Sequence, residues 1–441
     1  MHQLRKIPQW IDVLWVSLLA IYVLAGVTHV PFHGDESTLI YMGRDYYYHF
    51  IEGDMSKIQY DETWTINPAE QHLRLLNGTI PKYVFGLITS INGYLFDDIN
   101  EQWDWSNDYD YNASTGRIPS QELLIPARMG SAIQLALAIT IFFIIVRLVL
   151  NRPSAYLASL YLTLNPAILL NGRRAMMEGS HLLFMMLVLL AGILVIRYRK
   201  WWLFILLGIL SGLALSAKHP NAVIIALVFV ACGSYVVLHG LRHFKSQGRA
   251  TIQFIVGLTL SGILALAVFY ATNPSWWGDP FSRANTVLEL RNELLDIQIE
   301  QFDTYFTASD QINALLNFVF VAQPQYFEVT DWEKFPVITS QIEAYEQTIW
   351  TGIAIGGSTI GGIILAILVG FGILHLAQNT TILPEFRWFI LVWGIGIIII
   401  TYLLTPLEWQ RYYLPIYPFV GLISAYSVII LANILWKRFT Q

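Results

Sequence analysis

Cysteine and charge are both scarce in this sequence. Cys232 is the single cysteine among 441 residues, which excludes a disulfide bond within the chain. Only 13% of the residues are charged, whereas 55% are hydrophobic, and the mean hydropathy is +0.51. Soluble globular proteins rarely have such a composition, because they carry roughly twice this share of charge. The sequence therefore indicates a membrane protein.

Long uncharged apolar runs recur along the whole chain, and most are close to the ~20 residues that a helix needs to cross a bilayer. The predicted fold class is an all-α polytopic membrane protein, and residues 1–441 form a single domain. The short gap between the runs at 201–217 and 220–240 leaves a merged or re-entrant pair open. We predict about ten transmembrane helices, at 10–30, 125–150, 153–171, 178–197, 201–217, 220–240, 251–272, 350–377, 387–405 and 412–436.

Two long polar stretches, 31–124 and 273–349, interrupt the apolar runs. Within them, residues 36–51, 81–96 and 284–302 are candidates for helices at the membrane surface. Lysine and arginine concentrate in the short loops on the side of the two chain ends, and almost all acids fall on the other side. The positive-inside rule therefore places both termini in the cytoplasm and both long loops outside it. The expected location is the plasma membrane.

Charged residues from distant parts of the chain are predicted to lie at one depth, the outer membrane boundary. Charge near hydrocarbon loses hydration, so its presence there points to a function. Arginine and lysine suit phosphate oxygens, and a carboxylate can accept a proton from an attacking hydroxyl. We expect an apolar surround to raise the pKa of that carboxylate. The set comprises Asp35, Glu36, Lys82, Arg128, Arg174, Glu178, Lys218 and Arg411, with Tyr412 next to the last.

Each of these residues also has a structural interpretation. Asp35 and Glu36 are suited to the N-cap and first turn of a helix. Arg128, Arg173 and Arg174 are candidates for interface anchors whose long side chains reach water, and Glu178 for an acid that pairs with Arg173 or Arg174. Lys218 is a candidate for a plain loop lysine. The sequence shows no tight spacing of metal ligands, so no cofactor is predicted and a divalent metal is possible but not indicated.

Six short segments resemble one family in their order and spacing. The chain is similar to the GT-C superfamily, specifically the protein O-mannosyltransferase and aminoarabinose transferase-like group, glycosyltransferase family 39, whose members depend on a phospholipid carrier. The segment before Lys82 lacks the doubled proline of the family, and Glu178 stands where aspartate is commoner. The resemblance rests on Gly34-Asp35-Glu36, residues 76–83, Pro126-Ala127-Arg128, residues 173–178, residues 212–218 and residues 410–418.

The resemblance implies an inverting transfer of a sugar from a polyprenyl-phosphate donor to a hydroxyl of a protein, lipid or glycan. It makes Asp35 the general base with Glu36 in support. It assigns the donor phosphate to Arg128, Lys218, Arg411 and Lys82, with Glu178, Arg174 and Tyr412 as supporting residues. A lipid-linked sugar transporter or a non-catalytic partner subunit is the alternative. No nucleic-acid partner is predicted, and the sugar and the acceptor are not identified.

Overall fold

A computed structural model describes residues 8–439 of the chain except 62–67, 243, 303–306, 329–331, 333 and 406. In this part of the chain, the regular elements are all helices. Eight helical stretches are long and apolar enough to cross a membrane, which confirms an all-α polytopic membrane protein. These stretches are Trp10–His29, Gln121–Val149, Glu178–Tyr198, Asn221–Gly240, Gly248–Thr272, Thr359–Gln378, Pro384–Leu404 and Gln410–Phe439.

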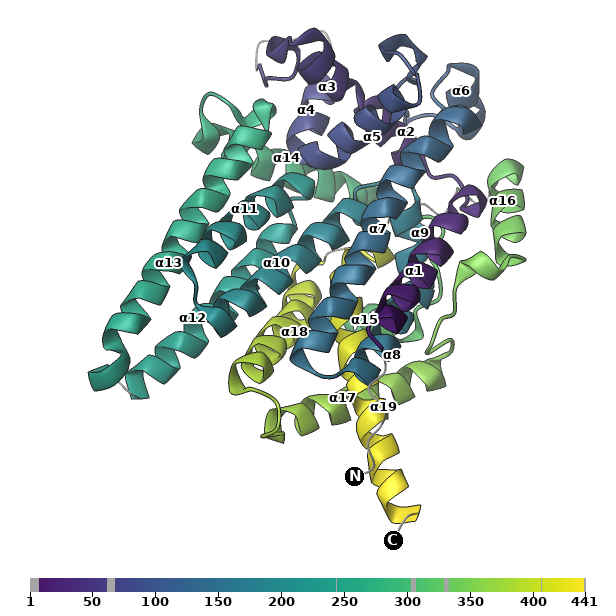
Figure 1. The fold of residues 1–441 in the computed structure, drawn as a ribbon. Coiled ribbons are helices and arrows are strands. Elements are labelled where there is room, and N and C mark those ends of the chain that lie inside the picture. The colour runs from purple at the N-terminus through teal and green to yellow at the C-terminus, as the bar shows by residue number, and fades with distance from the viewer. Residues whose placement is uncertain are drawn as a thin grey trace.

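The helices that form the bundle are packed roughly side by side (Figure 1). The long helix α7 runs through the bundle and contacts α1, α8 and α10, and its outer end contacts the loop helix α5. The bounds are α1 Trp10–Ala25, α5 Thr79–Ile91, α7 Gln121–Val149, α10 Glu178–Tyr198, α11 Trp201–Ala217, α12 Asn221–Arg242, α13 Phe244–Thr272, α17 Thr359–Gln378, α18 Pro384–Leu404 and α19 Tyr417–Phe439.

Two of the ten predicted spans differ from expectation. The run at 153–171 forms two short helices, α8 (Arg152–Leu164) and α9 (Pro166–Arg173). The break falls at Asn165, whose side-chain oxygen accepts the Ile168 N–H at 3.1 Å as the N-cap of α9, and Pro166 has no N–H with which to continue the preceding helix. The run at 201–217 forms α11, which is short for a span at 17 residues. It is a helix separate from α12, so the two do not merge.

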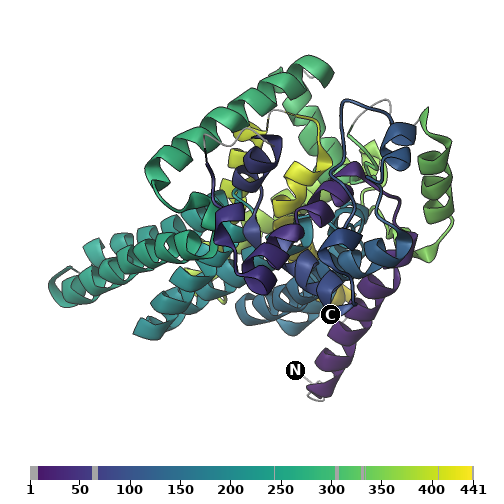
Figure 2. The same cartoon turned by 90° about the horizontal axis from the view of Figure 1, so that it is seen from above.

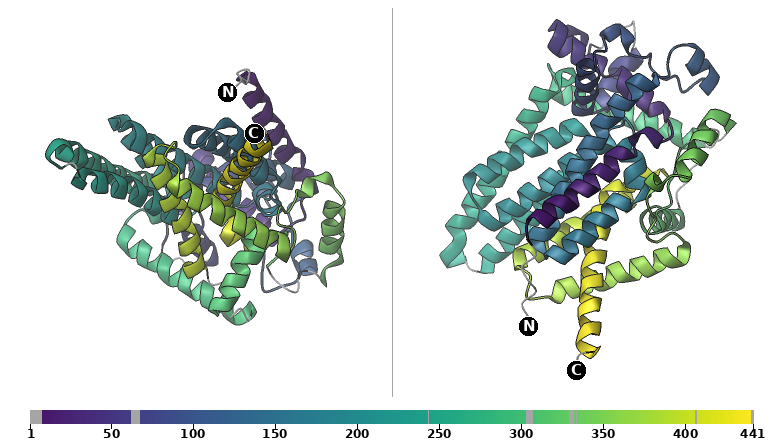
Figure 3. Two further views of the ribbon diagram at one scale, coloured as in Figure 1. Left: turned by 90° about the horizontal axis from the view of Figure 1, so that it is seen from below. Right: turned by 45° about the vertical axis from the view of Figure 1, so that its right-hand side comes forward.

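The first long loop folds into helices at the end of the bundle away from the two chain termini (Figures 1 and 3). Figure 2, which looks down on this end, shows them spread over the bundle. The predicted helix at 36–51 is divided into α2 (Gly34–Tyr41), α3 (Arg44–Tyr46) and a π-helical turn over 47–52. The other helices of this loop are α4 (Pro68–Leu76), α5, which covers most of the predicted 81–96 segment, and α6 (Tyr109–Ser114).

The second long loop contains α14 (Pro280–Phe302), α15 (Ala308–Leu315) and α16 (Pro336–Glu346). The first of these matches the predicted surface helix at 284–302. After α16, the chain returns through α17 and α18 to a 3₁₀ helix, η9 (Gln410–Ile416), which leads into α19. Because η9 contacts α9 and α10, it lies beside the segment that joins these two helices.

Candidate active site

The start of the first loop is fixed by a closed ion pair between Glu36 and Arg128. Arg128 donates to both carboxylate oxygens of Glu36, from Nε at 2.7 Å and from a terminal nitrogen at 2.8 Å. The backbone N–H of Ala175 adds a bond of 2.8 Å to the same carboxylate. Glu36 is fully buried and Arg128 is 2% exposed. Arg128 therefore lies in a buried pair and does not extend to the interface.

The same carboxylate closes the N-terminus of α2. Glu36 accepts the His33 backbone N–H at 3.0 Å, and the His33 ring accepts the Asp35 backbone N–H at 3.1 Å. This reciprocal arrangement is a capping box with His33 as the N-cap. The structural interpretation of Glu36 as a first-turn acid is confirmed, whereas the N-cap is His33 and not Asp35. The Asp35 side chain is left to make other contacts.

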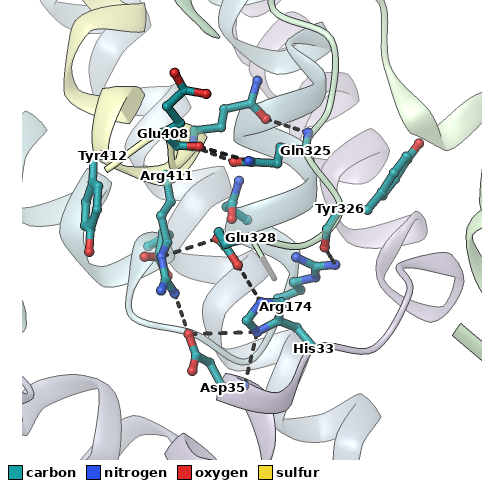
Figure 4. A network of polar contacts seen from close by, with 12 residues as sticks. His33, Asp35, Arg174, Gln325, Tyr326, Glu328, Glu408, Arg411 and Tyr412 are labelled. Carbon is teal, nitrogen blue, oxygen red and sulfur yellow. Dashed lines mark hydrogen bonds and ion pairs between the residues drawn. The ribbon is translucent and has the colours of Figure 1, made fainter. Parts of the chain in front are cut away.

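Asp35 belongs to a cluster with Arg411, Glu328 and His33. Figure 4 shows the guanidinium of Arg411 pointing between the two acids, with the His33 ring bridging them. Arg411 donates a hydrogen bond to Asp35, and its Nε lies 3.4 Å from Glu328. His33 Nδ1 already accepts an N–H, so Nε2 carries the ring proton and donates to Glu328 at 2.8 Å.

Asp35 is the most open member of this cluster. Its side chain is 28% exposed, against 15% for Arg411 and 7% for Glu328. Burial raises the pKa of the Asp35 carboxyl, but the nearby Arg411 guanidinium and His33 together outweigh this effect and hold that pKa below its ordinary value. The prediction that the pKa is raised is therefore wrong, because no local pattern in the sequence indicates that Arg411 pairs directly with this acid.

Glu328 was not predicted as a site residue. It is placed by a reciprocal pair of hydrogen bonds between Gln325 and Gln410, in which each backbone N–H donates to the other side-chain oxygen, at 2.9 and 2.7 Å. Arg174 adds to this positioning by donating to the Pro31 carbonyl at 3.2 Å and to the Tyr326 carbonyl at 2.7 Å. Glu328 meets His33, from which it is separated by 295 positions in the chain, and no spacing in the sequence indicates this contact.

Lys218 and Glu178 form a second ion pair close to the cluster. Lys218 Nζ donates to one Glu178 oxygen at 2.7 Å, and the lysine side chain is 13% exposed. Helix α10, which begins at Glu178, contacts η9, which carries Arg411. Of the four residues predicted to converge, Asp35 and Arg411 touch. Arg128 binds Glu36, the residue next to Asp35, and Lys218 binds Glu178.

Lys82 lies apart from this cluster. It is 1% exposed and its Nζ is 3.2 Å from Asp45, which also accepts a hydrogen bond of 2.8 Å from Arg74. Burial, together with the charges of Lys82 and Arg291, lowers the pKa of His219 to about 4. The imidazole is therefore neutral at pH 7.

A further cation approaches from α14 of the second loop. Arg291 donates to the hydroxyl of Tyr412 at 3.3 Å. Tyr412 in turn stacks on Trp409 with ring centroids 5.5 Å apart, and the Arg411 guanidinium lies 4.8 Å from the Trp409 ring centroid. The sequence predicted a surface helix here but did not single out Arg291. Among the residues that the structure describes, no group of three or more His, Cys, Asp or Glu is arranged to hold a metal ion.

A family match covers part of this site. Residues 100–274 match the sequence profile of the family described as Dolichyl-phosphate-mannose-protein mannosyltransferase. The matched stretch contains Arg128, Arg174, Glu178 and Lys218, while Asp35 precedes it. No curated protein matches the chain in sequence.

Solved structures match almost the whole chain. ArnT from Cupriavidus metallidurans bound to undecaprenyl phosphate is similar with a TM-score of 0.53 and 12% identity, over 98% of this chain and 62% of that one. This chain therefore spans less than two thirds of the length of that protein. Archaeal oligosaccharyltransferase AglB from Archaeoglobus fulgidus, in complex with an inhibitory peptide and a dolichol-phosphate, matches with a TM-score of 0.46 and 14% identity, over 98% of this chain and 52% of that one. The predicted resemblance is thus borne out in sequence over residues 100–274, which match the mannosyltransferase family, and the fold of nearly the whole chain is similar to that of ArnT.

Proposed function

We propose that this protein transfers a sugar from a polyprenyl-phosphate donor to an acceptor hydroxyl at the extracytoplasmic face of the membrane. The observation that carries the proposal is the state of Asp35, an ionised carboxylate that is oriented by Arg411 and remains partly exposed. A general base needs both properties, because it must be unprotonated and within reach of the hydroxyl. The undecaprenyl phosphate bound to the similar ArnT structure supports this class of donor.

The proposed reaction is a single displacement with inversion at the anomeric carbon. The acceptor oxygen bonds to that carbon while the bond to the donor phosphate oxygen breaks, and the lipid phosphate leaves with the bonding electrons. The hydroxyl proton passes to Asp35. The negative charge that develops on the phosphate is stabilised best by cations fixed in advance near it.

The exposures divide the predicted cations into two groups. Arg411 and Lys218 are 15% and 13% exposed, so a phosphate can reach them, and Arg291 from α14 is close to the same place through Tyr412. We assign the donor phosphate to these three residues. The cations of the other group, Arg128 and Lys82, are enclosed with their acids, and we propose that they, with Glu36, Arg174 and Glu178, position the loops.

The proposed orientation follows the charge distribution. The site lies at the end of the bundle opposite the two termini (Figure 1), and the basic residues of the short loops favour the cytoplasm for the termini. A donor anchored in the outer leaflet would then present its phosphate at the depth of Arg411 and Lys218. A hydroxyl acceptor from protein, lipid or glycan approaches from the extracytoplasmic side, as in protein glycosylation or cell-envelope modification.

The test is to incubate the purified protein with a panel of polyprenyl-phosphate sugars and to measure which donor is consumed, with and without chelator. With the donor so identified, Asp35→Asn should lower turnover by roughly 10²–10⁴-fold, the usual contribution of a general base. Asp97→Asn, at an exposed acid of the same loop, is the matched control and should keep full activity. Undiminished turnover by folded Asp35→Asn protein would remove Asp35 from the mechanism.

A further inference from the structure

A groove lies between α11 and α13, away from the candidate active site. It has a volume of about 630 Å³, which falls in the range of ~300–1,000 Å³ typical of small-molecule sites. Most of its walls are apolar, and one end is closed by a cation. The lining includes Phe204 and Ile205 of α11, Val256, Leu260 and Leu264 of α13, and Arg199.

The groove follows from the different lengths of the two helices. Ser216, near the end of α11, and Thr272, at the end of α13, are joined by a hydrogen bond of 2.7 Å between their hydroxyls, so the helices are level at the outer end. α13 has 29 residues and α11 has 17, so α13 extends ~18 Å further at the other end. Figure 1 shows the α12–α13 hairpin continuing past the start of α11.

The short helix leaves a mismatch with the bilayer. At 1.5 Å per residue, α11 spans ~26 Å, whereas the hydrocarbon core is ~30 Å thick. The bilayer must then thin locally, or polar and cationic residues must meet lipid headgroups below the normal depth. The start of α11 is therefore a place where the protein and a headgroup come into direct contact.

The residues at this start suit an anionic headgroup. Arg199 adopts a left-handed conformation with φ of 53° that ends α10, and its guanidinium lies 5.9 Å from the Phe254 ring centroid. Arg199 and Lys200 are exposed, and neither makes an ion pair within the part of the chain that the structure describes. Arg197, one turn earlier, is instead paired with Glu385 at 3.0 Å.

Aromatic side chains mark the same depth. Trp201 is 73% exposed and Trp202 is 47% exposed, and exposed tryptophans are typical of the boundary between headgroups and hydrocarbon. A lipid chain in the groove would therefore continue directly to a headgroup at the two cations. An uncharged ligand would leave both cations without a partner.

We propose that the groove binds one anionic phospholipid from the leaflet on the side of the chain termini. An acyl chain fills the space between α11 and α13, and the phosphate lies at Arg199 and Lys200. The site is independent of the proposed transfer reaction, because it is at the other end of α11 from Lys218. Its role is to fill the space that the short helix leaves and to support the α12–α13 hairpin.

The test is native mass spectrometry of the full chain in a mild non-ionic detergent, titrated with phosphatidylglycerol or phosphatidylcholine. The wild type should retain one phosphatidylglycerol in preference to phosphatidylcholine. Arg199→Gln together with Lys200→Gln should weaken binding of phosphatidylglycerol by about 25-fold, or about fivefold for each charge near the membrane surface. Leu260→Trp, which fills the groove, should also weaken it.

Arg438→Gln is the matched control, because Arg438 is exposed near the end of α19, outside the groove. It should bind phosphatidylglycerol as the wild type does. A thermal unfolding curve for each variant separates loss of the site from loss of the fold. Equal retention of the two lipids, or full retention by the folded double variant, would overturn the site. Preferential retention of a polyprenyl phosphate would overturn the choice of ligand. Consumption of the sugar donor is measured in a separate assay. A negative result for the lipid site can therefore be distinguished from a negative result for the proposed transferase activity.

Discussion

Replacing Glu36 by Gln tests whether this residue serves the fold or the chemistry. The substitution keeps the size of the side chain but leaves Arg128 as a buried cation without a carboxylate, at 2% exposure. Removing one partner of a buried ion pair typically costs about 3–5 kcal/mol, because the remaining charge is uncompensated. Glu36 also accepts two backbone N–H bonds, which an amide oxygen can keep only in part. We therefore expect a large loss of stability.

The expected change in melting temperature follows from chain length. At ~2.1 cal/mol/K of unfolding entropy per residue, a chain of this size loses roughly 1 °C for each kcal/mol, so Glu36→Gln should lower Tm by roughly 3–5 °C. Intrinsic fluorescence during thermal unfolding in detergent measures this shift. Glu101→Gln is the control, since Glu101 pairs with Arg44 at 3.1 Å but is 56% exposed. An exposed pair contributes less than ~1 kcal/mol, so this variant should melt within about 1 °C of the wild type.

A second substitution distinguishes pairing from other effects. Combining Glu36→Gln with Arg128→Met removes the stranded cation, so the double variant should melt higher than Glu36→Gln alone. If Glu36→Gln melts like the wild type, or if the double variant melts lower than the single one, the ion pair does not hold the first loop as described. If stability is unchanged and turnover is lost, Glu36 acts in the chemistry instead.

Three further results are expected. A Cβ at Gly34 would meet ring atoms of two tryptophans at 2.9 and 3.0 Å, so Gly34→Ala should cost about 1–3 kcal/mol, whereas Gly370→Ala, which meets nothing within 4 Å, should be neutral or slightly stabilising. The pKa values of Asp35 and Glu328 are lowered in the folded state. These two acids therefore stabilise the folded protein fully at pH values above their ordinary pKa values of 3.8 and 4.5, and this stabilisation is lost as the pH falls below those values. Glu328→Gln should melt lower at pH 7 and flatten the Tm–pH curve in acid. If the donor phosphate draws Arg411 away from Asp35, Asp35 should have a lower pKa in the free enzyme than in the enzyme–donor complex. The pH profile of kcat/KM reports the free enzyme and that of kcat the complex, so activity should fall at lower pH in the kcat/KM profile than in the kcat profile. If both profiles fall at the same pH, this exchange does not occur.

The helical bundle was largely predictable, because run length and lack of charge are local properties of the chain. The exceptions are also local. Asn165-Pro166 ends one helix and starts another within a run that is apolar enough to be one span, and hydropathy alone does not register that break. Gly43 lies at the break in the predicted 36–51 helix, and its backbone approaches Gly86 of α5 so closely that a Cβ would meet the Gly86 nitrogen at 3.1 Å. A single sequence does not show which distant residue will lie against the backbone of a given glycine.

The candidate site was predictable in its members but not in their pairing. The charges were predicted to lie at one boundary of the membrane, and Asp35 and Arg411 do touch, while Lys218 pairs with Glu178. Which cation meets which acid depends on tertiary contacts such as the Gln325–Gln410 pair. For this reason Glu328 was overlooked, and the direction of the pKa shift of Asp35 was predicted wrongly. Glu328 is one acid among many in a long loop, and no local feature of the sequence distinguishes it from the others.

The ion pairs near the membrane boundary differ in one respect that bears on function. Glu36–Arg128 and Asp45–Lys82 are enclosed, so exchanging either partner for a substrate group would first require unpacking the loop. Asp35–Arg411 has both members partly exposed, and an arriving phosphate can compete for Arg411 without moving the backbone. In the proposed mechanism, once Arg411 turns to the phosphate, less of the effect of burial is offset, and the pKa of Asp35 should rise. Pairing with Arg411 would thus keep Asp35 ionised before the donor binds. When the donor binds, Asp35 would become a stronger base, so Arg411 would connect donor binding to proton acceptance.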